Sequence, residues 1–201
     1  MKSPIQYPDI VLSNYPKDVT ARGLTALIAR HADEDAKTQM IDFIYHRLHR
    51  RYIMPLSKVP VKYKSGFLIM ATACLMIATL QSFYEGTKVT PKPNRDAFKE
   101  FFEREKTDFP ALAEDSANFY KSIRCGILHQ AETKNGYRLT RNPNEPLFDK
   151  KAKTINANKF MEALDRCLEN YIGTLRVAKP SSLVWKNAVR KLTFICDNCK
   201  C

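Results

Sequence analysis

Apolar residues recur at helical spacing along most of this chain. One helix is predicted for residues 20–32, and a second carries an apolar stripe from residue 40 to 52. A long apolar helix follows at about 63–84, and then a short one capped by Asn94. Later helices are predicted for 111–131, for 156–177 and for a last segment ending near residue 196. The pattern indicates a chain built almost entirely of helices.

Residues 132–155 break this periodicity. Short mixed runs flank Asn135-Gly136, a dipeptide typical of tight β-hairpins. We therefore predict an all-α helical bundle with one small β-hairpin after the 111–131 helix. The expected organisation is an N-terminal arm with helices packed on the core (1–60), a helical bundle (61–178), and a basic C-terminal helix with a cysteine-rich tail (179–201).

The uncharged stretch from Gly66 to Tyr84 raises the alternative of a membrane span. Polar and small residues interrupt it, and its strongly apolar part is shorter than the roughly 20 residues that a span needs. A buried core helix is the preferred interpretation. Residues 1–20 are polar and contain several prolines, unlike a signal peptide. We expect a cytoplasmic protein with no membrane partner.

The charge distribution favours a polyanionic partner. The formal net charge is +12, and residues 43–84 contain no acidic residue. Lysine and arginine neutralise phosphates, so we predict nucleic-acid contacts within this stretch. The predicted contact residues are Arg47, Arg50, Arg51, Lys62 and Lys64. The alternative is a cationic face that only maintains solubility.

The clearest candidate for chemistry is Arg124 followed five residues later by His129. Histidine titrates near neutral pH and suits acid–base catalysis, and arginine binds two phosphate oxygens at once. In one regular helix, side chains five residues apart point about 140° away from each other. A two-fold dimer would bring both copies to one cleft. Alternatively, Arg124 pairs with an acidic neighbour and His129 caps the helix.

The string IRCGILHQAETKNGYRL, residues 123–139, resembles the HEPN superfamily of helical bundles, which carry an Arg-x(4–6)-His motif. The similarity is greatest to a bacterial, often plasmid-borne branch, over about residues 60–178. The resemblance implies metal-independent RNA cleavage without a cofactor. His129 would deprotonate the ribose 2′-hydroxyl, Arg124 would hold the scissile phosphate, and a 2′,3′-cyclic phosphate would form. It also implies a homodimer and a toxin or anti-phage defence effector with an antitoxin or regulatory partner.

The neighbours of the motif leave alternatives open. Cys125 stands where many HEPN nucleases have a polar residue, often asparagine. This difference favours a non-catalytic HEPN-like RNA-binding or scaffolding module, and a cysteine nucleophile with His129 as its base is a further alternative. Four more side chains would line the same cleft: Tyr120, Lys121, Gln130 and Glu132. Glu132 would orient His129 or lie in a solvent-facing turn.

The tail carries Cys196, Cys199 and Cys201. Cys-x-x-Cys is a metal-ligand spacing, but the sequence offers no matching second pair of ligands. Without a secretory signal we expect reduced thiols in a frayed terminus. We predict no metal site.

Overall fold

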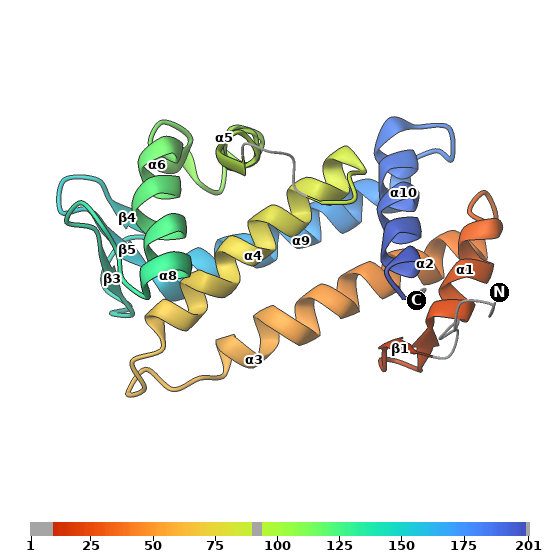
Figure 1. Cartoon of the computed structure of the whole chain (residues 1–201), viewed down its shortest axis with the longest axis horizontal. Helices are drawn as coiled ribbons and strands as arrows, with labels where there is room; N and C mark the ends of the chain where they lie inside the picture. Colours follow the sequence, from red (N-terminus) through yellow and green to blue (C-terminus); the bar gives the residue numbers. More distant parts are fainter. Residues whose placement is uncertain (1–9, 90–93, 200–201) are drawn as a thin grey trace, which may run out of the picture. The chain divides into compact units, whose positions relative to one another are not determined.

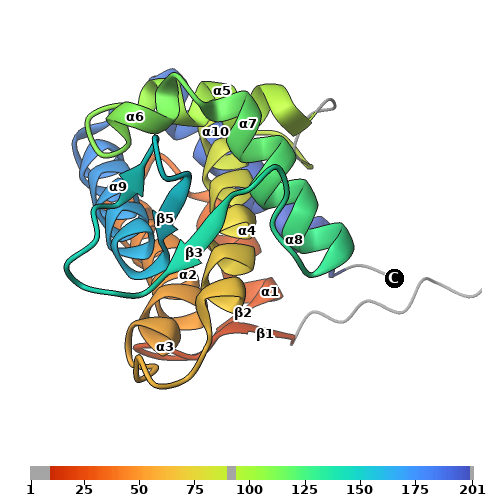
Figure 2. The same ribbon diagram turned by 90° about the vertical axis from the view of Figure 1, so that its left-hand side faces the viewer.

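The computed structural model describes residues 10–89 and 94–199 of the chain. Helices dominate the described residues and the strands form two small sheets, which confirms the predicted all-α class (Figures 1 and 2). Contacts divide the described chain into two compact units. The first unit comprises residues 10–51, 82–89 and 169–199, and the second comprises residues 52–81 and 94–168.

The first unit contains β1 (Val11–Ser13), β2 (Val19–Thr20), α1 (Ala21–Ala29), α2 (Glu34–Leu48) and α10 (Leu183–Asp197). Thr20, Asp33 and Ser182 cap the three helices, because each side-chain oxygen accepts a bond from the backbone N–H three residues later. Trp185 is fully buried, and its indole N–H donates to the His31 carbonyl at 3.1 Å. The antiparallel pairing of β1 with β2 was not predicted, and residues 1–9 of the predicted arm lie outside the described residues.

Two long helices contribute to both units: α4 (Gly66–Glu85) and α9 (Ala157–Val177). Among the described helices, only α4 is long and apolar enough to cross a membrane, with a mean hydropathy of 1.8 over its most apolar window. That window is 61% buried, which agrees with a core helix, although length and composition alone do not separate the two cases.

Aromatic packing forms the core of the second unit. Its helices are α3 (Met54–Ser57), α5 (Asn94–Arg104), α6 (Pro110–Ala113), α7 (Ser116–Phe119) and α8 (Cys125–Gln130). Phe119 stacks on Phe160 with ring centroids 5.4 Å apart and meets Phe102 edge-on at 5.0 Å. These three rings are fully buried, and their contacts hold α7, α5 and α9 together.

The helix predicted for residues 111–131 is wrong as a single element. It consists of α6, α7, a π-helical turn η2 (Tyr120–Arg124) and α8. The second predicted helix extends beyond its apolar stripe, because α2 continues through a second π-helical turn, η1 (His49–Ile53), into α3. Pro55, which has no backbone N–H to donate, lies shortly after this π-helical turn.

A three-stranded sheet follows the motif helix: β3 (Arg138–Thr140), β4 (Phe148–Asp149) and β5 (Thr154–Asn156). β5 lies in the middle, parallel to β3 and antiparallel to β4. The β4–β5 hairpin agrees with the prediction of a small hairpin after the motif helix. Asn135 and Gly136 do form a turn, with φ of 55° and 76°, but its two flanks do not pair with each other.

Candidate active site

Arg124 and His129 meet within one chain. The guanidinium Nη1 lies 3.1 Å from the imidazole Nε2, in an exposed position on the second unit. The expectation that one chain would keep these side chains apart is therefore wrong. Arg124 ends the π-helical turn η2, so the helix is not regular here, and the long arginine side chain covers the remaining separation.

This contact indicates which imidazole nitrogen accepts. Arginine has only hydrogen-bond donors, so Nε2 is the acceptor, as in the tautomer that carries its ring proton on Nδ1. The basic nitrogen of His129 is thus held next to a permanent cation. An anionic group that entered between them would find both a base and a charge partner.

The predicted pairing of Arg124 with an acidic neighbour does not occur among the described residues. The other partner of Arg124 is Tyr120, whose ring centroid lies 5.4 Å from the guanidinium carbon. Tyr120 in turn meets Phe98 edge-on at 5.3 Å. Burial raises the pKa of the Tyr120 hydroxyl, while the charge of Arg124 acts in the opposite direction and a hydrogen bond with Cys125 adds to the rise. Tyr120 therefore stays neutral and connects the arginine to the aromatic core.

Gly126 allows the chain after the motif to pack back onto the helix. A Cβ at this position would lie 2.4 Å from the Glu132 carbonyl oxygen, closer than any real contact. Ala131 ends α8 in the left-handed region, with φ of 55°, and reverses the chain direction. The Lys134 N–H then donates to the Ser122 carbonyl at 3.0 Å. Sequence reasoning missed this role, although a glycine inside a predicted helix was a visible signal.

The remaining predicted site residues differ in their surroundings. Cys125 is half-buried and bonded to Tyr120, and within the described residues it has no contact with His129 that would form a nucleophile–base pair. Gln130 and Glu132 are exposed, and the described structure contains no hydrogen bond from either side chain to His129. Lys121 is exposed and lines a surface hollow that neither Arg124 nor His129 lines.

The predicted RNA-contact residues fall into two groups. In the first unit, Arg47 and Arg51 both donate to the Leu12 carbonyl, with 2.5 Å for Arg51, and so hold β1 against the end of α2. Arg50 lies 3.7 Å above the Tyr15 ring. Lys62 and Lys64 are exposed in the loop before α4, in the second unit. Two of the arginines therefore have a structural task in addition to any contact with RNA.

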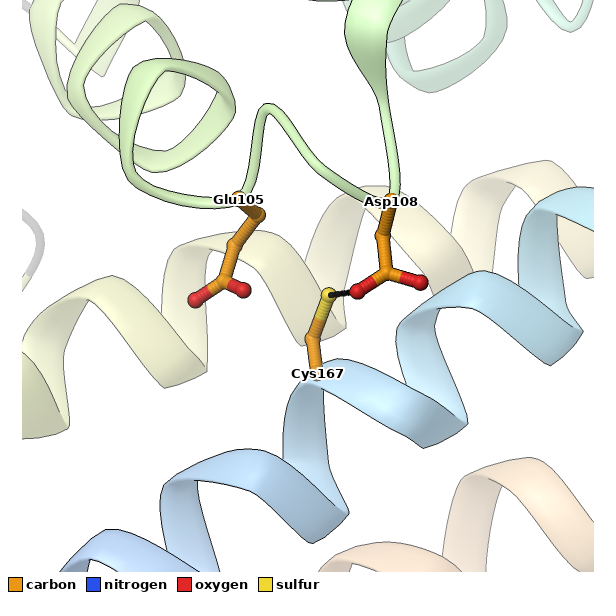
Figure 3. Close-up of side chains that lie close together, drawn as sticks. All are labelled: Glu105, Asp108 and Cys167. Atoms are coloured by element: carbon orange, nitrogen blue, oxygen red, sulfur yellow. Dashed lines mark hydrogen bonds between the residues drawn. The ribbon is translucent and has the colours of Figure 1, made fainter.

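One cluster in the second unit has the donor atoms of a metal site. Glu105 and Asp108 come from the turn between α5 and α6, and Cys167 comes from α9; their ligand atoms lie within 4.8 Å of one another (Figure 3). Burial, followed by the two carboxylates, raises the pKa of the Cys167 thiol. The thiol donates to Asp108, and Arg166 pairs with the same carboxylate at 2.7 Å, so Asp108 has two partners within the protein.

The described cysteines of the tail, Cys196 and Cys199, differ in burial and in hydrogen-bond partner. Cys196 is buried, with its sulfur 3.8 Å from the Ala21 carbonyl oxygen, and the Cys199 thiol donates to Ile195 at 3.5 Å. Cys201 lies outside the described residues. Cys196 belongs to the last turn of α10, and the Cys199 N–H donates to the Cys196 carbonyl at 3.0 Å, so the predicted fraying is wrong for these two cysteines.

No protein-family model, curated protein or solved structure matches this chain. Functional inference depends on the residues and their geometry.

Proposed function

We propose that this chain is a HEPN-like, metal-independent endoribonuclease. The observation that carries the proposal is the 3.1 Å pairing of Arg124 with His129 on an exposed surface. A base and a phosphate-binding cation are adjacent there, which is the arrangement that cleavage by an internal nucleophile requires. The resemblance of residues 123–139 to HEPN proteins supports the same chemistry.

The reaction uses the substrate's own hydroxyl group. His129 Nε2 takes the proton of a ribose 2′-hydroxyl, and the 2′-oxygen attacks the adjacent phosphorus. The bond from phosphorus to the 5′-oxygen breaks, and the leaving oxygen takes a proton from the protonated imidazole or from water. The products are a 2′,3′-cyclic phosphate and a 5′-hydroxyl. Arg124 exchanges its bond to His129 for bonds to phosphate oxygens and stabilises the developing charge.

A non-catalytic HEPN-like binding or scaffolding module is the second candidate. One observation favours it: Arg124 occupies the lone pair that a general base would use. Cys125 fits this candidate too, because a thiol is a weaker hydrogen-bond partner for phosphate than an amide. The catalytic proposal requires that substrate phosphate displaces the guanidinium from Nε2.

The proposed assembly is a homodimer in the cytoplasm, acting as a toxin or defence effector under an antitoxin or regulatory partner. The pairing within one chain removes the geometric reason for a second copy. A different observation supports the dimer: Leu128 on the motif helix and Leu75 on α4 are 45% and 43% exposed. Burying such side chains against a partner is favourable.

The deciding experiment incubates purified protein with total RNA in EDTA. Cleavage that leaves 2′,3′-cyclic phosphate ends, and that is lost in His129→Ala, supports the enzyme. Removal of a positioned base lowers the rate by about 10²–10⁴-fold. RNA binding without cleavage in the wild-type protein would assign the binding module instead.

A further inference from the structure

A second polar site lies in the same unit as Arg124 and His129. A hollow of about 360 Å³ opens between the segment leading into the motif helix and the turns around the small sheet. These two parts, α7–η2 on one side and β3–β5 on the other, stand beside each other in Figures 1 and 2. The hollow is lined by Asp115, Asn118, Lys121, Asn135, Tyr137, Lys150 and Lys153.

Lysines dominate the charge of this hollow. Lys121 has no hydrogen-bond or ion-pair partner among the described residues, and Lys150 contacts only the exposed Glu114, at 3.2 Å. Lys153 donates to the Asn135 carbonyl at 3.1 Å and keeps two further hydrogens. Three ammonium groups from two separate segments therefore surround one hollow large enough for a phosphate group.

The lining contains one carboxylate, Asp115, against these three lysines. Asp115 is buried, and both of its oxygens are occupied: Asn118 Nδ2 donates to Oδ1 at 2.7 Å, and the Tyr137 hydroxyl donates to Oδ2. These bonds hold Asp115 within the wall of the hollow. The carboxylate thus serves as a fixed acceptor that positions an amide and a phenol.

Each side-chain amide in the lining has a donor to spare. The Nδ2 atoms of Asn118 and Asn135 carry two hydrogens, of which the described bonds use one, to Asp115 and to Ser122 Oγ respectively. The backbone is also specialised here, since Asn135 and Lys153 have φ of 55° and 50°. Left-handed residues are uncommon outside glycine, and the bond between Lys153 and Asn135 joins the two turns that contain them.

We propose that this hollow binds a backbone phosphate of a single-stranded RNA next to the phosphate that Arg124 holds. This inference rests on the proposed function, since it takes RNA as the ligand. Lysines bind phosphate as point charges, and amide N–H groups direct its oxygens. Lys121 lies in η2 with Arg124, and Asn135 is bonded to Ser122 between them. The second contact would hold the strand in register at the reacting ribose.

The test uses a labelled single-stranded RNA and a His129→Ala background, so that the strand remains intact. Binding is measured by fluorescence anisotropy as a function of salt. Each phosphate contact with a single strand contributes about 0.7 to the salt slope, so Lys121→Gln with Lys150→Gln, which together remove the contact with one phosphate, should lower the slope by about 0.7. Lys151→Gln removes the same charge from an exposed neighbour that does not line the hollow, and it should leave the slope unchanged.

An unchanged slope in the double variant, or an equal loss in Lys151→Gln, would overturn the proposal. A second arm titrates inorganic phosphate and adenosine monophosphate against isotope-labelled protein and follows the side-chain amides of Asn118 and Asn135. RNA should shift both amide signals at lower concentration than either small ligand. Shifts with the small ligands alone would overturn the assignment to RNA.

The result is separable from the proposed catalysis. If wild-type protein cleaves RNA but the slope does not respond to the two substitutions, the hollow fails and the enzyme remains. If the slope falls as expected but wild-type protein does not cleave, the hollow remains and the catalytic proposal fails.

Discussion

Replacing Gly126 by alanine tests the central packing contact of the candidate site. The new Cβ would lie 2.4 Å from the Glu132 carbonyl oxygen and 3.3 Å from the Thr133 Cα, so both neighbours are backbone atoms. An ordinary contact begins near 3.4 Å, and the returning chain must therefore move by about 1 Å. Overpacking of this kind costs about 1–3 kcal/mol.

Helix propensity partly offsets that cost. Alanine is better than glycine inside a helix by about 0.5–1 kcal/mol. Gly126→Ala should therefore lower the free energy of unfolding by about 1 kcal/mol, the difference between the middles of the two ranges. Displacement of residues 131–134 should also weaken the bond from the Lys134 N–H to Ser122, and reduce any RNA cleavage at the adjacent His129.

Gly173→Ala supplies a matched control. Gly173 lies within α9, and a Cβ there would meet nothing within 4 Å. This substitution should raise stability by about 0.5–1 kcal/mol, because only the propensity changes. Urea unfolding followed by circular dichroism measures both variants. A Gly126→Ala protein as stable as wild type would refute the packing argument, provided that Gly173→Ala shows its gain.

Further expectations follow for the motif, the buried tyrosine and the arginines. Arg124→Lys should retain folding but recover only part of the cleavage rate, because an ammonium cannot bind two phosphate oxygens in parallel; single-turnover kinetics would show this. Burial and Asp115 raise the folded-state pKa of Tyr137, so its contribution to stability is complete below the ordinary tyrosine value near 10 and is lost as pH rises further. Tyr137→Phe should therefore show less alkaline loss of stability than wild type when melting temperature is followed from neutral to alkaline pH. Arg51→Gln removes a bond to Leu12 and should speed proteolysis near β1; equal digestion rates would contradict that anchoring role. Neutralising Arg50, Lys62 and Lys64 should lower the salt slope of RNA binding by about 0.7 for each real phosphate contact.

The sequence by itself determined the helical class and much of the core. Phe98, Phe102 and Leu164 repeat at helical spacing within predicted helices and are buried in the structure, since a helix buries one face wherever it packs. It also singled out Arg124 and His129 from their chemistry, and Asn135-Gly136 as a turn. These features depend on residue type and on spacing over a few positions, which can be read without knowledge of distant contacts.

Tertiary structure decided how those residues meet. The π-helical turn that ends at Arg124 has no sequence signature in helical periodicity, and it made the pairing with His129 possible within one chain. Asn135 bonds to Ser122, which lies 13 residues earlier in the sequence. Strand β5 pairs with β3, where Thr154 lies opposite Arg138, 16 residues earlier. Arg47 and Arg51 were predicted as RNA-contact residues, and both donate to the carbonyl of Leu12, more than thirty residues earlier in the sequence. Long-range hydrogen bonds of this kind depend on which groups the folded backbone brings together. They satisfy polar backbone groups whose need for a partner cannot be read from the local sequence pattern.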